Sequence, residues 1–354
     1  MIYSVVSGQY CNIAADEAFK LFDSLVLPIL CYSSEIWGYG YLEIIEKVHA
    51  NFCKRVCCLH QHVCTFLAIS DCGRTPISIV YMSGCVNYWT RHTQMQYHRY
   101  PKQCYTMVRN LDNVGRVTGA SHIRQLLFHT RFGYAWIANG VGSIPVFLKQ
   151  FKNQHRDCSI QNLQSKINES SKSAYYKHYK SILQVEQYLS TDLPVMYKRA
   201  MSDLRCSGHC LMIENGRHFN LDKEYRYCPV CLHNVIRIIE DEMHFLLVCP
   251  LYNTLRKELF PAQWQTNCVC QRSFYNIMSD KNKRNIVQLS KYLYAFELRK
   301  CTYSLTITFV TVPLFSQLHR RIHFQLKWPS CLIGLLNIVY TLSYQFESRI
   351  CTIT

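Results

Sequence analysis

The feature that most constrains this fold is a set of three cysteines and one histidine with the spacing C-x2-C-x12-H-x4-C. The four candidate ligands are Cys228, Cys231, His244 and Cys249. Three thiolates and one imidazole complete a tetrahedral Zn²⁺ site and leave no position open for water or substrate. The spacing therefore predicts a structural zinc ion that organises the fold rather than a catalytic one. The alternative is that these four groups are buried or free without any metal.

The same spacing is also that of a ββα finger whose last histidine is replaced by cysteine. Such a finger needs two apolar residues between its ligand pairs, and this chain has Val235 and Asp241 at those positions. A buried carboxylate at Asp241 would be costly, and the acidic run 240–242 would repel phosphate. We therefore do not expect a DNA-reading finger here.

The chain has 20 cysteines, but its first residues lack the basic start, apolar core and cleavage site of a secretory leader. Free thiols in a reducing compartment are therefore expected, which indicates an intracellular protein, nuclear or cytoplasmic and not secreted. A second group of thiols and imidazoles could hold another metal, although packing at a helix end is the favoured interpretation. Its members are Cys57, Cys58, His60, His62 and Cys64.

The net charge is +16 and the isoelectric point is near 9.1, which favours RNA or DNA as a partner. The charge is concentrated in residues 51–214, which carry 20 Lys and Arg against 8 Asp and Glu. The candidate phosphate contacts are Lys54, Arg55, Arg91, Arg99, Lys177, Lys180, Lys198 and Arg199, with Tyr175, Tyr176 and Tyr179 as candidate stacking platforms. The alternative is that each is an ordinary solvated surface residue.

Apolar residues recur at helical spacing and few stretches alternate with period two, so we expect a mainly α fold with little sheet. Helices are predicted over about 15–30, 41–59, 76–89, 121–136, 172–189, 194–214, 250–260 and 286–296. The expected segments are a helical region at 1–70, a basic connecting region at 71–214, the zinc-binding segment at 215–262, C-terminal helices at 263–300 and an atypical apolar tail at 301–354.

The tail contains an uncharged stretch at 328–346, which has about the length that a membrane span requires. Pro329, Gly334 and Asn337 interrupt its apolar character. A membrane-associated protein is therefore an alternative that we do not favour.

Several runs resemble the reverse transcriptases of non-LTR (LINE-type) retrotransposons. The stretch Leu21–Trp37, its continuation Ile45–Val56 and the turn Gly73-Arg74-Thr75-Pro76 resemble the segment that follows the catalytic palm. The stretch Leu204–Asn220 and the Cys/His cluster with DEMHFLLVCPLY resemble the C-terminal zinc-binding segment, so the resemblance covers roughly 14–300. It implies thumb-like helices and C-terminal regions that bind element RNA and target DNA.

This chain departs from that family at two points. The spacer between Cys231 and His244 is a few residues longer, and the sequence contains no Asp-Asp pair of the kind that holds two Mg²⁺ ions in a palm. We therefore expect a truncated, non-catalytic fragment that binds nucleic acid. The alternatives are a polymerase component that acts only with a palm-bearing reverse transcriptase in trans, and a relic without a selected function.

Overall fold

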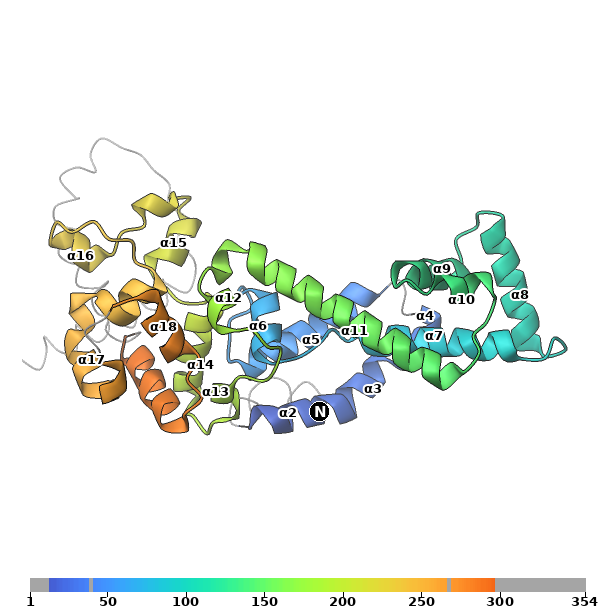
Figure 1. Cartoon of the computed structure of the whole chain (residues 1–354), viewed down its shortest axis with the longest axis horizontal. Coiled ribbons are helices and arrows are strands. Elements are labelled where there is room, and N and C mark those ends of the chain that lie inside the picture. Colours follow the sequence, from blue (N-terminus) through green and yellow to red (C-terminus); the bar gives the residue numbers. More distant parts are fainter. Residues whose placement is uncertain (1–12, 38–40, 266–268, 297–354) are drawn as a thin grey trace, which may run out of the picture. The chain divides into compact units, whose positions relative to one another are not determined.

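The computed structural model describes residues 13–37, 41–265 and 269–296, and these residues are mainly helical (Figure 1). Strand pairing among them consists of two isolated antiparallel bridges, Cys72 with Val185 and Tyr227 with Ile239. The prediction of a mainly α fold with little sheet is confirmed. The apolar tail lies outside the described residues, and with it the uncharged stretch at 328–346.

The first helical run contains α2 (Ala15–Leu21), a π-helical turn (Phe22–Val26) and α3 (Leu27–Leu30). Pro28 is the second residue of α3, directly after the π-helical turn. Phe22 stacks on Phe52 with ring centroids 4.2 Å apart, which joins this run to the next helix.

The remaining elements follow in chain order. The first group contains α4 (Ser34–Trp37), α5 (Leu42–Val56), α6 (Thr65–Asp71), α7 (Ser78–Gln94), α8 (Tyr100–Asn113), α9 (Gly119–His129), α10 (Gly133–Ile137) and α11 (Ile144–Glu169). The second contains α12 (Tyr176–Tyr179), α13 (Gln187–Ser190), α14 (Val195–Arg205), α15 (Met212–His218), α16 (Pro229–His233), α17 (Asn253–Leu259), α18 (Gln271–Met278) and a last helix at 283–296. The predicted helix over about 194–214 is in fact divided, because α14 ends at Arg205 and α15 begins at Met212.

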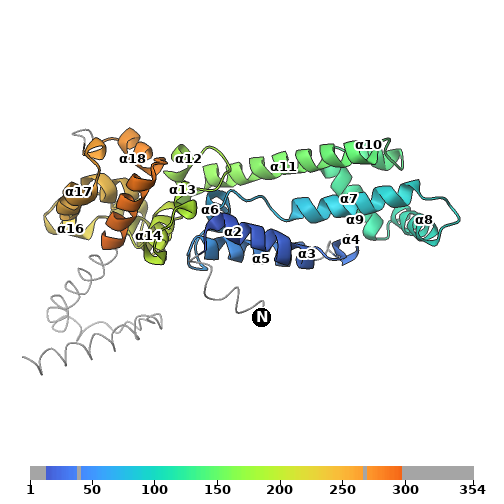
Figure 2. The same ribbon diagram turned by 90° about the horizontal axis from the view of Figure 1, so that it is seen from below.

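Two hydrophobic clusters hold these helices. The larger, called the main core below, contains Phe22, Leu67, Leu204, Phe245 and Leu293 among many others. It therefore takes residues from each of the four segments expected before residue 301. The smaller cluster lies among α7, α9, α10 and the first half of α11, and we call residues 78–169 the α7–α11 lobe. α11 packs along α7, as both ribbon views show (Figures 1 and 2).

The turn before α7 depends on Gly73. Its φ of +60° is in the left-handed region, and an added Cβ would lie 2.3 Å from the carbonyl carbon of Gln184. Glycine is therefore required for both the turn and the close approach of the two segments. At the start of α7, the carboxylate of Glu46 accepts from the Ser78 N–H at 2.8 Å.

A buried ionic network lies at the centre of the main core. Asp71 is fully buried, and its carboxylate accepts from Arg205 Nε at 2.9 Å, Tyr176 Oη at 2.7 Å and Tyr188 Oη at 2.9 Å. Burial would raise the pKa of Asp71, but the charge and hydrogen bonds of Arg205, with the charge of Lys180 and the hydrogen bond from Tyr176, together lower it below its usual value. Arg205 also pairs with Glu186 at 2.9 Å, so one cation joins two carboxylates from different helices.

None of the helices in the described ranges combines the length and the apolar character that a membrane crossing demands.

Candidate metal centre

Cys228 and Cys231 are positioned by a short paired segment and the turn that follows it. Cys228 donates its N–H to the carbonyl of Ile238 at 2.8 Å, beside the bridge between Tyr227 and Ile239. Pro229 then opens α16, and Ile236 N–H returns to the Cys231 carbonyl at 2.9 Å. This knuckle points both thiols toward the same interior point.

A single π-helical turn, His244–Val248, begins at His244 and is followed directly by Cys249. The turn begins where Asp241 Oδ1 accepts from the His244 N–H at 2.7 Å, and it ends where Cys249 N–H donates to the His244 carbonyl at 2.8 Å. The side chain of Phe245 points the other way and packs on Phe296 with ring centroids 4.1 Å apart. The ligand turn is therefore anchored in the main core.

The geometry of the four groups fits a tetrahedral metal ion. The Sγ atoms of Cys228 and Cys249 are 3.9 Å apart, Cys231 Sγ lies 3.5 Å from His244 Nε2, and all four ligand atoms lie within 4.8 Å of one another. Zinc bonds of about 2.3 Å to sulfur and about 2.0 Å to nitrogen give tetrahedral edges of roughly 3.8 Å and 3.5 Å. All four residues are buried, so this Cys3His group could hold a metal ion.

The electrostatics of the cluster also fit a cation. A hydrogen bond from Cys249 lowers the pKa of the Cys228 thiol to about 3, whereas the same bond raises the pKa of Cys249, and burial raises that of Cys231 to about 11. One thiolate can thus form unaided, and a bound divalent ion would ionise the other two. His244 Nδ1 is buried and has no hydrogen-bond partner among the described residues.

The acidic run at 240–242 builds the framework of the cluster. Glu240 Oε2 accepts from the Met212 N–H at 2.7 Å, Asp241 also accepts from Tyr175 Oη at 2.6 Å, and Glu242 lies 3.2 Å from His209 Nε2. Val235 is 88% exposed and fills no core. The ββα finger arrangement is therefore absent from this segment, as the sequence indicated.

The structure corrects three of the predicted phosphate contacts. Lys54 is buried and donates to the Gln61 carbonyl at 2.6 Å, while Lys180 is buried and paired with Glu186. Lys198 is also buried, at 4% exposure. The long aliphatic stems of these lysines lie inside the main core, which helical spacing alone did not reveal. These three amines are not available to a phosphate.

Of the predicted stacking tyrosines, Tyr176 is buried and Tyr175 and Tyr179 are half-buried. The Tyr176 hydroxyl is bonded to Asp71, that of Tyr175 to Asp241, and the Tyr179 ring lies 5.0 Å from the Arg205 guanidinium. They hold the main core together and offer no platform to a base.

The other five predicted contacts are at least partly accessible. Lys177 is half-buried and Arg55 is exposed, while exposed Arg199 donates from Nε to the Cys58 carbonyl at 3.3 Å. Arg91 and Arg99 are exposed and line one surface hollow of about 470 Å³. The hollow, called the Arg91/Arg99 hollow below, is also lined by Gln94, Met95, Gln96 and Ile144.

The alternative second metal site does not assemble in the described part of the chain. His60 and His62 stack on each other at the surface, whereas Cys57 is buried with its Sγ 3.4 Å from that of Cys72. The preferred interpretation, packing at a helix end, agrees with this arrangement. Cys72, which follows α6, is a neighbour that the sequence spacing did not suggest.

Comparison with protein-family models, with curated proteins and with solved structures gives no match to this chain.

Proposed function

We propose that this chain binds RNA or DNA through the α7–α11 lobe, without catalysing a reaction on it. The observation that carries the proposal is the Arg91/Arg99 hollow, where two guanidinium groups line one depression. Neither group has a carboxylate partner among the described residues. Two unpaired, adjacent guanidiniums are suited to the phosphates of a nucleic-acid backbone.

The composition of the lobe supports the same function. Residues 78–169 contain eleven Lys and Arg but only three Asp and Glu, which is a net charge of +8 over this stretch. One of the three carboxylates, Asp112, is buried and already paired with Arg124 at 2.9 Å. The cations of the lobe therefore have few internal partners, and an external polyanion would neutralise them.

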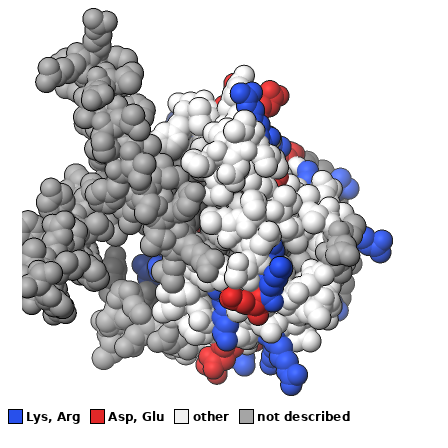
Figure 3. Space-filling model, turned by 90° about the vertical axis from the view of Figure 1, so that its left-hand side faces the viewer, with Lys and Arg blue, Asp and Glu red and all other residues white. Residues whose placement is uncertain are grey.

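The opposite end of the molecule lacks such a concentration of charge. Viewed from the end with α16 and α17, the described surface is mainly uncharged, with single Lys and Arg side chains standing apart (Figure 3). In our proposal the cysteine–histidine group therefore has a structural role. Its three sulfurs and one nitrogen favour zinc, which would stabilise this end without touching the nucleic acid.

The resemblance to the post-palm and zinc-binding segments of non-LTR retrotransposon reverse transcriptases supports a nucleic-acid partner of the same kind. In that family, the corresponding region would grip element RNA or target DNA while a palm elsewhere performs synthesis. The missing Asp-Asp pair supports binding without polymerisation by this chain.

The test is the salt dependence of binding to a labelled single strand and a labelled duplex. If Arg91 and Arg99 contact phosphates, the variant Arg91→Ala/Arg99→Ala should bind more weakly and its log–log salt slope should fall by about 2. The matched control, Arg237→Ala/Arg272→Ala, removes the same charge from exposed positions outside the lobe and should keep the original slope. A slope near zero for the unchanged chain would refute the proposal.

A further inference from the structure

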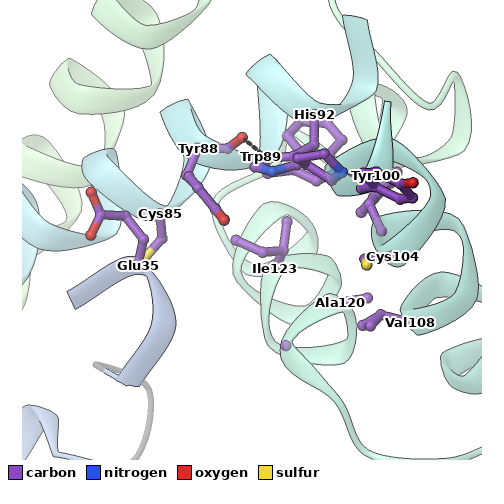
Figure 4. A pocket seen from close by; sticks show the side chains of 13 residues that line it. Glu35, Cys85, Tyr88, Trp89, His92, Tyr100, Cys104, Val108, Ala120 and Ile123 are labelled. Carbon is purple, nitrogen blue, oxygen red and sulfur yellow. Dashed lines mark hydrogen bonds between the residues drawn. The ribbon is translucent and has the colours of Figure 1, made fainter. Parts of the chain in front are cut away.

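A second depression, mostly in the α7–α11 lobe, has the rings of Tyr88, Trp89, Tyr100 and Tyr105 among its thirteen lining residues. It has a volume of about 480 Å³ and lies among α4, α7, α8 and α9. Figure 4 shows Tyr88 and Trp89 reaching it from α7 and Tyr100 from α8, with Ile123 on α9 and Glu35 on α4. We call it the aromatic pocket. Its volume lies within the usual range for small-ligand sites, about 300–1,000 Å³.

The inner aromatic wall is held in place by a chain of hydrogen bonds. Trp89 Nε1 donates to Tyr105 Oη at 3.0 Å, and Tyr105 in turn donates to Asn139 Oδ1 at 2.9 Å. Trp136 stacks behind Trp89, with ring centroids 6.1 Å apart. The polar edges of Trp89 and Tyr105 are therefore already satisfied. Trp89 is buried in the inner wall, so the rings that are accessible to a ligand are Tyr88 and Tyr100, at 45% and 82% exposure.

Two other lining residues differ from the inner wall. Tyr100 is 82% exposed, so its ring can cover a flat ligand from outside. Glu35 is the one carboxylate in the lining, and no hydrogen bond or ion pair joins it to another described residue. A flat ring suits the exposed face of Tyr100, whereas the Glu35 carboxylate points away from the other labelled side chains (Figure 4).

The position of the pocket favours a base that is attached to a phosphate backbone. The aromatic pocket and the Arg91/Arg99 hollow both use the end of α7 and the start of α8, where Arg91 precedes His92 and Arg99 precedes Tyr100. The two depressions thus take alternating residues from the same connection between α7 and α8. Aromatic rings together with cations are the combination by which proteins hold single strands.

We infer that the aromatic pocket receives one unstacked base of a single-stranded nucleic acid whose phosphates lie on Arg91 and Arg99. The inference rests on the proposed function and specifies its preferred ligand. A base inside a duplex is paired and stacked and cannot enter without being extruded, so the pocket would contribute to single-strand binding alone.

Two variants test the pocket without touching the cations. Gly119 lines the pocket and has open space where a Cβ would project, so Gly119→Leu should fill part of it without disturbing the helix. Gly142→Leu is the matched control, since an added Cβ there also meets open space but lies outside the pocket. Tyr100→Ala removes the outer ring, and Tyr97→Ala removes a ring that is 70% exposed but does not line the pocket.

The experiment measures fluorescence anisotropy with a labelled single strand of about ten nucleotides, and with the corresponding duplex. Gly119→Leu and Tyr100→Ala should each weaken single-strand binding by about 5-fold to 100-fold, with an unchanged salt slope and unchanged duplex binding. Both controls should bind as the unchanged chain does.

The possible failures are distinguishable. Salt-dependent binding that needs Arg91 and Arg99 but is unaffected by Gly119→Leu and Tyr100→Ala would overturn the inference and leave the proposed function standing. Equal losses on the single strand and the duplex would also overturn it. Absence of salt-dependent binding by the unchanged chain would reject the proposed function and this inference together.

Discussion

The main core and the α7–α11 lobe use charged residues in opposite ways. In the main core, Asp71, Arg205, Glu186 and Lys180 are joined in one buried or half-buried network, and further carboxylates cap backbone N–H groups beside the metal ligands. The lobe contains eleven Lys and Arg but only three Asp and Glu. The comparison teaches that the overall positive charge is a poor guide to a binding surface, because many of the charges in the main core already have internal partners.

The largest expected effect is the loss of the metal. Cys228→Ser replaces a thiolate with a poor zinc ligand, so the purified protein should lose stoichiometric metal, and the knuckle and the ligand turn should unfold locally. Structural zinc sites contribute about 10 kcal/mol or more in small peptides, which is comparable with the whole net stability of a domain. Metal content per chain and limited proteolysis measure the two effects.

The control for that experiment is Cys104→Ser, which removes an exposed thiol outside the cluster. It should retain the metal and the original proteolysis pattern. An unchanged protein that is purified without metal, and is insensitive to chelators, would contradict the metal centre.

The next effect concerns the buried ions of the main core. Arg205→Met would leave Asp71 and Glu186 without their shared cation, and we expect a loss of about 3–5 kcal/mol in the free energy of unfolding. Chemical denaturation followed by circular dichroism measures it. In contrast, Arg91→Met changes an exposed arginine and should alter the stability by less than about 0.5 kcal/mol. If both variants lost a similar free energy of unfolding, the charged residues of the two regions would not differ in their contribution to stability.

A cavity in the lobe would test whether its own hydrophobic cluster is a separate source of stability. Phe151 is fully buried between α11 and its neighbours, so Phe151→Ala should cost about 3 kcal/mol. The variant should lose nucleic-acid binding before it loses metal, because the cysteine–histidine group belongs to the main core. Parallel measurement of metal content and binding during thermal unfolding checks this order.

The smallest effect is a pH dependence at Asp203. Burial raises the pKa of this carboxyl from 3.8 to about 6, so its ionised form is disfavoured in the folded state. The resulting destabilisation is absent below about pH 4, grows as the pH rises through 6 and is complete above that. Asp203→Asn should therefore raise the stability at pH 7.5 by on the order of 1–2 kcal/mol and leave it nearly unchanged at pH 4. Melting temperatures of the variant and the unchanged chain at the two pH values test this prediction. An equal rise in melting temperature at both pH values would contradict it.

The metal ligands were predictable because they lie close together in the sequence at a recognisable spacing. The Asp71–Arg205 pair was not, because its partners are 134 residues apart and neither has a sequence signature. The longest helix, α11, was also missed, since only Phe147, Phe151 and Ile167 of its residues are buried and no continuous apolar stripe marks it. The three buried lysines were misassigned as phosphate contacts for a related reason. A charged residue is usually exposed, and the sequence does not show when the fold buries it.

α11 connects the two clusters through its opposite ends. Phe147 and Phe151 belong to the small cluster, whereas Ile167 belongs to the main core. A continuous helix of 26 residues is about 39 Å long and resists bending. If the lobe binds nucleic acid as proposed, a shift of the first half of α11 would also move Ile167 in the main core.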